Sequence, residues 1–168
     1  LDTQISMLTI AAARLFALGE DPQRTGTEHP GRVPSAAFAC AGDEWLHISG
    51  SDQHWQAICS VLRLDELAAD TALARNAERV KQRERVMAAM REALAGRKRA
   101  DVAEALRAAG VPAGEVNTVA QALADPHVQA RGMVAEFRHP TAGAFPALRN
   151  PLRFTGYDAP SLGTPPLH

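Results

Sequence analysis

An apolar segment near the start of the chain, residues 5–18, most limits what this protein can fold into. Its sequence is ISMLTIAAARLFAL, in which Arg14 is the one charged residue. The Ala- and Leu-rich composition predicts a helix over residues 3–19 that ends at Gly19. This helix is apolar almost all round, and such helices are buried on several sides. Since the first residue is Leu and not Met, we interpret the chain as a piece of a larger protein that covers this helix.

The same segment has the features of neither a membrane-spanning helix nor a secretory signal peptide. A membrane-spanning helix needs about 20 apolar residues, which is longer than this run. A signal peptide begins with a basic region, and none precedes residue 5. We therefore expect no membrane association.

Apolar periodicity and turn residues predict the remaining elements. Two short apolar runs on either side of Gly42 predict a β-hairpin with strands near residues 36–40 and 45–49. The helix that follows begins at Ser51 or Asp52, either of which suits the N-cap. Further helices are expected at residues 65–69, 77–94 and 101–110. The capping-box spacing of Thr118 with Gln121 predicts the start of another helix, and Asp125 before Pro126 predicts the N-cap of a short one. A strand at 134–139 and an extended, proline-rich tail follow.

These elements predict which side chains form the core and which fold class results. The apolar positions expected to face inward are Trp55, Ile58, Cys59, Leu62, Val80, Met87, Met90 and Leu94. Apolar side chains of the tail that also require burial are Phe145, Leu148, Leu152, Phe154 and Tyr157. The predicted class is α+β: a helix-dominated small domain with a small antiparallel sheet, flanked by a linker helix and an extended C-terminal segment.

Composition narrows the function classes. The formal net charge is −1, and with two Trp and one Tyr the chain lacks the material of a base-stacking platform. Cys40 and Cys59 lie in apolar runs, so we expect buried, reduced thiols and a cytoplasmic location. The six histidines are not spaced as metal ligands, so no metal site is expected.

A local excess of positive charge leaves one alternative open. Residues 75–99 contain nine Arg or Lys and three Glu. This helix could bind nucleic acid or a partner, attract the phosphates of an anionic cofactor, or be a solvated face with side-chain ion pairs. We favour the solvated face and expect no nucleic acid, since the pattern of a recognition helix is absent.

Six ordered segments resemble the family III CoA-transferases of the CaiB/BaiF, formyl-CoA transferase-like type. Three of them are Arg24-Thr25-Gly26-Thr27-Glu28-His29-Pro30, Gly50-Ser51-Asp52-Gln53-His54-Trp55 and Asn76-x-x-Arg79-Val80. The others are the predicted loop AGVPAGEVN at residues 109–117, DPHVQARGM at residues 125–133 and Asn150-Pro151-x-Arg153-Phe154. Each is weak alone, but together they follow the family's order over nearly the whole chain.

The resemblance implies a domain organisation. Proteins of this family have a large Rossmann-like domain and a small α+β domain, and two chains interlock as a homodimer. By that resemblance residues 1–24 are a linker helix from a large domain, 25–140 the small domain and 141–168 an extended return linker.

The resemblance also implies the chemistry. The family uses an aspartate nucleophile to move CoA between an acyl-CoA and a carboxylic acid, with CoA as a substrate and no tightly bound cofactor. That aspartate precedes every segment matched here, and Asp2 is not assigned the role. The chain alone is therefore expected to be inactive.

The resemblance points to Ser35, Gly50, Ser51 and Asp52 as walls of the acyl pocket. The family often has Tyr at the position of Ser35, so the resemblance leaves the substrate contacts at this position open. The related α-methylacyl-CoA racemases usually have Glu at the position of Asp52, which favours a transferase and leaves a racemase as the alternative. Asp52 also suits simple helix capping, and the two roles are compatible.

Overall fold

The structure is a computed structural model that describes residues 1–152 and 155–156. The chain divides into two compact units, Leu1–Val116 and Asn117–His168, and each is described by itself. Three residues with a predicted role, Arg153, Phe154 and Tyr157, lie outside the described residues.

A three-stranded antiparallel sheet organises the first unit. Its strands are β1 (Ser35–Ala39), β2 (Trp45–Ser49) and β3 (Ala113–Val116), in the order β1-β2-β3. The predicted hairpin is confirmed, and its register pairs Phe38 with Leu46. Strand β3 was expected to be a loop, but Gly114 pairs with His47 of β2. The sequence pattern did not predict this strand because Pro112 and Gly114 are residue types depleted in strands.

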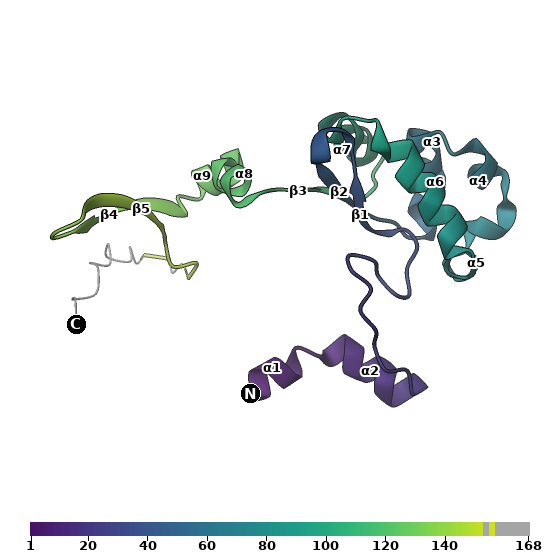
Figure 1. Ribbon diagram of the computed structural model, residues 1–168, viewed down its shortest axis with the longest axis horizontal. Helices are drawn as coiled ribbons and strands as arrows, with labels where there is room; N and C mark the ends of the chain where they lie inside the picture. The colour runs from purple at the N-terminus through teal and green to yellow at the C-terminus, as the bar shows by residue number, and fades with distance from the viewer. Residues whose placement is uncertain (153–154, 157–168) are drawn as a thin grey trace. The chain divides into compact units, whose positions relative to one another are not determined.

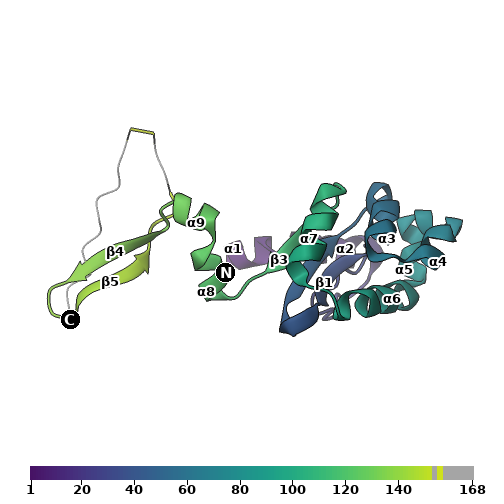
Figure 2. The same ribbon diagram turned by 90° about the horizontal axis from the view of Figure 1, so that it is seen from above.

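Helices cover this sheet. They are α3 (Trp55–Leu62), α4 (Asp65–Ala69), α5 (Asn76–Lys81), α6 (Arg83–Ala95) and α7 (Arg99–Ala108). A 3₁₀ turn, η2 (Asp52–His54), leads into α3, and another, η3 (Thr71–Ala74), precedes α5. Helix α6 packs against β1, while α7 packs against β2 and β3 (Figures 1 and 2).

The buried core confirms most of the predicted inward positions. Trp55, Ile58, Cys59 and Leu62 are all buried on one face of α3. Met87, Met90 and Leu94 of α6 are buried as predicted, whereas Val80 is only partly buried. The opposing side chains come from alternate positions of the sheet, namely Ala36, Phe38, Leu46 and Ile48.

Two predicted helices differ from the structure because tertiary contacts override local propensity. The helix expected over residues 77–94 is broken at Gln82, which lies between α5 and α6 and has non-helical backbone angles. The helix expected from Asp101 begins at Arg99, without a side-chain cap. Arg99 is held there by an ion pair to Glu44 at 3.0 Å and a hydrogen bond to the carbonyl of Val116.

The apolar N-terminal segment is helical but not one helix. It forms α1 (Asp2–Ser6) and α2 (Thr9–Leu18), and Gly19 ends α2 with a positive φ of 68°, as predicted for a C-terminal glycine. At the break the Thr9 hydroxyl donates to the carbonyl of Ser6 at 2.6 Å. Neither helix buries any residue among those described, so the expected burial is not provided by this part of the chain.

The second unit contains two short helices and a hairpin. The predicted capping box of Thr118 with Gln121 opens α8 (Val119–Ala124), and Asp125 caps α9 (Pro126–Ala130), as predicted. The predicted strand is β4 (Val134–His139). It pairs with β5 (Gly143–Leu148), which is a correction, because we expected an extended tail there (Figure 1). Pro146 obscured β5, yet proline is tolerated in an edge strand.

The fold class is confirmed: the protein is α+β, rich in helix, with small antiparallel sheets. Within the described part of the chain, none of the helices has the length and apolar character that crossing a membrane requires.

Candidate functional site

Ser35 and Gly50 lie side by side where β1 begins and β2 ends. Ser35 pairs with Ser49 across the hairpin, and their hydroxyl oxygens are 3.4 Å apart. The backbone N–H of Gly50 donates to the carbonyl of Pro34 at 2.8 Å. A Cβ added to Gly50 would lie 2.6 Å from Cδ1 of Ile58 and 3.3 Å from the ring of Pro34. Close approach therefore explains glycine at this position.

Ser51 is the N-cap of the turn that begins α3, so one of the two predicted caps is confirmed. His54 folds back toward it: the backbone N–H of Ser51 donates to Nδ1 of His54 at 3.1 Å. The Ser51 hydroxyl lies 3.0 Å from the same nitrogen. The backbone of the Gly-x-Asp turn is thereby fixed by its own sequence.

Asp52 does not cap its own helix, which corrects the simple capping interpretation. Its Oδ1 atom accepts the backbone N–H of Asn76 at 2.7 Å, and Asn76 is the first residue of α5. The same oxygen accepts from Nη2 of Arg79, also at 2.7 Å. Asp52 therefore caps a helix that is distant in sequence and pairs with a cation on it.

Arg79 joins the segments that carry the candidate residues. Its side chain is 0% exposed, while that of Asp52 is 57% exposed. Its Nε donates to the carbonyl of Val33 at 2.6 Å, and Nη1 donates to the carbonyls of Leu73 and Ala74. The guanidinium carbon lies 4.9 Å from the ring centroid of Trp55, in cation–π geometry.

The sequence indicated Asn76 and Arg79 only through the family-like motif, and their contacts were not predicted. Charge patterning placed Arg79 on a solvated helix face, and that interpretation was wrong for this residue. Arginine is almost never fully buried unless it is paired. The one available signal was therefore the Asn76-x-x-Arg79 spacing.

A cleft with a volume of about 530 Å³, which we name the Asp52 cleft, lies beside these residues. Its lining residues are His29, Gly31, Arg32, Ser51, Asp52, Gln53 and Asn76. Two of the four predicted site residues, Ser51 and Asp52, therefore line it. The other two, Ser35 and Gly50, adjoin it through the backbone and are not among its lining residues.

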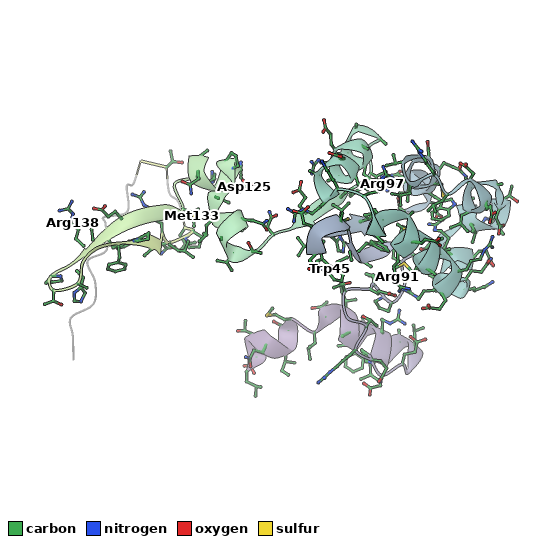
Figure 3. All side chains as sticks on the ribbon, turned by 45° about the horizontal axis from the view of Figure 1, so that its top comes forward. Trp45, Arg91, Arg97, Asp125, Met133 and Arg138 are labelled. Atoms are coloured by element: carbon green, nitrogen blue, oxygen red, sulfur yellow. The ribbon has the colours of Figure 1, made fainter. Side chains whose placement is uncertain are left out.

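The basic helical region is mostly paired with acids or backbone carbonyls. Glu28 accepts from both Arg83 and Arg91, and Lys81 pairs with Glu78 at 2.7 Å. Arg97, just after α6, donates to the carbonyl of Val61; Arg91 and Arg97 are labelled in Figure 3. These contacts favour a structural face over a nucleic-acid surface, because the positive charges are already matched.

Both cysteines are buried free thiols, as predicted. Burial raises the pKa of Cys59 to about 11, with the nearby Arg79 opposing this effect. Burial also raises the pKa of Cys40, and Glu44 adds to the rise. Such thiols are poor nucleophiles at neutral pH. Within residues 1–152 and 155–156, no cluster of three or more His, Cys, Asp or Glu could hold a metal ion.

The whole chain, residues 1–168, matches the family described as CoA-transferase family III. The chain belongs to CoA-transferase family III. The family predicted from the six ordered segments is thus confirmed.

Relatives of this family III chain are named as CoA-transferases. It is 30% identical over 159 residues to an acetyl-CoA:oxalate CoA-transferase of Acetobacter aceti, covering 95% of this chain and 40% of that protein. It is 26% identical over 167 residues to a succinyl-CoA:glutarate CoA-transferase of Mus musculus, covering 99% and 38%. The chain therefore spans about two fifths of the length of the curated relatives it matches.

A solved structure agrees with this assignment. A CaiB/BaiF family protein from Brucella suis superposes with a TM-score of 0.80 at 33% identity, covering 96% of this chain and 42% of that one. The family III chain therefore shares both sequence and fold with this part of the Brucella protein.

Proposed function

We propose that the protein containing this chain transfers CoA between an acyl-CoA and a carboxylic acid. The observation that carries the proposal is the family match over residues 1–168. The names of the relatives, which pair an acyl-CoA donor with oxalate or glutarate, support it.

The proposed route is covalent and uses CoA as a substrate, with no tightly bound cofactor. An aspartate carboxylate attacks the thioester carbonyl, expels CoA thiolate and forms a mixed anhydride. The thiolate attacks the aspartyl carbonyl, releases the donor acid and leaves an enzyme-bound CoA thioester. The acceptor carboxylate attacks that thioester, expels CoA thiolate and forms a second mixed anhydride. The thiolate then attacks the acceptor acyl carbonyl, which gives the new acyl-CoA and releases the aspartate carboxylate.

This chain supplies a wall of the acyl pocket in the proposal, not the nucleophile. Ser51 and Asp52 border the cleft, and Ser35 and Gly50 hold the adjoining backbone. We propose residues 1–24 as a linker helix, 25–140 as the small domain and 141–168 as a return linker. We further propose an interlocked homodimer and a cytoplasmic location, the latter supported by the two free thiols.

The test uses the full-length protein and the 168-residue chain in parallel. Each is incubated with succinyl-CoA and a panel of acids that includes oxalate and glutarate, and new acyl-CoA is measured by mass spectrometry. We expect product from the full-length protein and none from the chain alone. A parallel assay follows deuterium uptake at Cα of a 2-methylacyl-CoA.

Each outcome separates the alternatives. Deuterium uptake without CoA transfer would replace the transferase by the racemase. Full-length protein that gives neither product nor exchange contradicts both enzymes and leaves a non-catalytic interaction module. Turnover by the 168-residue chain contradicts the proposed position of the nucleophile.

A further inference from the structure

We propose that the Asp52 cleft binds a substrate oxyanion, either a carboxylate or a phosphate, and that Arg32 is its principal contact. The cleft's volume of about 530 Å³ falls in the range of small-molecule sites. That the oxyanion belongs to an acceptor acid or to CoA rests on the proposed function. The charge of the cleft is argued from its own residues.

The negative charge of Asp52 does not make the cleft anionic. Its Oδ1 atom is 2.7 Å from the buried guanidinium of Arg79, with which it forms an ion pair. A second donor, the backbone N–H of Asn76, binds the same oxygen. The carboxylate is therefore matched by a cation behind the cleft wall, and the charge that remains at the surface comes from other lining residues.

Arg32 supplies that remaining charge. Its side chain is exposed, lines the cleft and makes no hydrogen bond or ion pair with the residues that the structure describes. Arg83 and Arg91, by contrast, both share Glu28. The guanidinium of Arg32 thus keeps its donors for a ligand, and its fork matches a carboxylate or phosphate.

The backbone that carries Arg32 is held in place on both sides. The side chain of Asn76 donates to the carbonyl of Gly31 at 3.0 Å and accepts the N–H of Val33 at 3.0 Å. Asn76 is itself tied to Asp52 through its backbone. A fixed backbone lowers the entropy lost when a ligand binds, which is the property of a preorganised site.

His29 adds a second donor to the cleft. Its Nδ1 atom accepts the backbone N–H of Gly31 at 3.0 Å. An imidazole whose Nδ1 accepts a hydrogen bond carries its proton on Nε2, so His29 retains one N–H donor. With Arg32, the cleft presents two donors of the kind that bind oxyanions.

The experiment measures equilibrium binding to the full-length protein by titration calorimetry. The probes are succinate and glutarate for a carboxylate, and adenosine 3′,5′-bisphosphate for the phosphates of CoA. The variant is Arg32→Gln, and Lys98→Gln is the matched control, because Lys98 is exposed, carries the same charge and lies outside the cleft. Arg32→Lys tests whether the charge alone suffices.

We expect Arg32→Gln to weaken one probe by about ten- to hundredfold, the effect of one hydrogen bond to a charged group. Lys98→Gln should change binding by less than about twofold, as expected for screened surface charge, and Arg32→Lys should recover part of the loss. Loss with the dicarboxylates assigns the acceptor acid, and loss with the bisphosphate assigns CoA. Unchanged affinity in Arg32→Gln, or no binding by the wild type, overturns the proposal.

The transfer assay runs on the same preparations. Arg32-dependent binding without transfer would support the oxyanion site and contradict the proposed function. Transfer that occurs while no probe depends on Arg32 for binding would support the proposed function and contradict the oxyanion site.

Discussion

The β-sheet core and the N-terminal helices have similar apolar character but opposite exposure. Phe38 of β1 is 1% exposed, whereas Phe16 of α2 is 84% exposed. Phe38 belongs to one cluster formed by strands and helices that are distant in sequence. Helix α2 buries none of its residues within the described chain.

The difference shows that apolar composition predicts that a segment will be buried, but does not predict which residues will cover it. A contiguous exposed apolar surface marks an interaction site in most soluble proteins. We propose that the surface of α1 and α2 is covered in the full-length protein, whose family III relatives are much longer than this chain.

A matched pair of leucine truncations tests this comparison and has the largest expected effect. Leu46 is 0% exposed and Leu18 is 61% exposed. In the 168-residue chain, Leu46→Ala should lower the free energy of unfolding by about 2–5 kcal/mol because it removes buried area and leaves a cavity. Leu18→Ala should change it by less than about 0.5 kcal/mol. Urea unfolding followed by circular dichroism measures both.

The same two substitutions, measured in the full-length protein, test whether residues outside the 168-residue chain cover α2. If other residues cover α2, Leu18→Ala becomes costly there, by about 1–3 kcal/mol, which corresponds to burial of a leucine side chain. An equally small effect in both proteins would show that α2 stays exposed, and our proposal for its covering would fail.

A second test compares the Asp52–Arg79 pair, in which Arg79 is fully buried, with the exposed Glu78–Lys81 pair. Asp52→Asn keeps an oxygen for Asn76 and Arg79 but removes the charge that offsets a fully buried guanidinium. We expect a loss of about 1–3 kcal/mol in stability. Glu78→Gln should cost less than about 0.5 kcal/mol, because both partners are solvated.

A double-mutant cycle identifies the cause. In an Arg79→Met background the buried charge is gone, so Asp52→Asn should lose most of its effect. Chemical denaturation of the four proteins gives the coupling energy. A cost that persists undiminished in that background would mean that Arg79 is not the group that Asp52 stabilises.

Local patterns predicted the elements whose causes are local. The caps at Ser51, Thr118 and Asp125 and the glycine at Gly19 are confirmed, since each depends on bonds or backbone angles within a few residues. The inward face of α3 is confirmed for the same reason, because helical spacing alone selects it.

The site depended on contacts that local patterns do not contain. Asp52 meets Asn76 and Arg79 through a fold that joins two segments distant in sequence, so the sequence offered only the family-like motifs. Strand β3 was missed because its partner β2 lies far away along the chain. Burial of Arg79 contradicted its charge, and the carboxylate of Asp52 together with the carbonyls of Val33, Leu73 and Ala74 explains it.

The smallest expected effect is the pH dependence of stability that comes from Cys59, and it tests whether water reaches the core around this thiol. Burial raises the pKa of Cys59 from 9.0 to about 11 in the folded protein. Between those values the unfolded chain has lost its thiol proton and the native protein retains it, so stability falls as pH rises. From pH 8 to pH 10 the loss attributable to this thiol should be about 1 kcal/mol, measured by urea unfolding.

Cys59→Ala provides the control for that pH dependence. The substitution lowers stability at every pH because it leaves a small cavity, but it removes the titrating group. The drop between pH 8 and pH 10 should therefore be smaller by about 1 kcal/mol than in the parent chain. Equal drops in both proteins would mean that the Cys59 thiol ionises as readily in the native protein as in the unfolded chain, and that water reaches this part of the core.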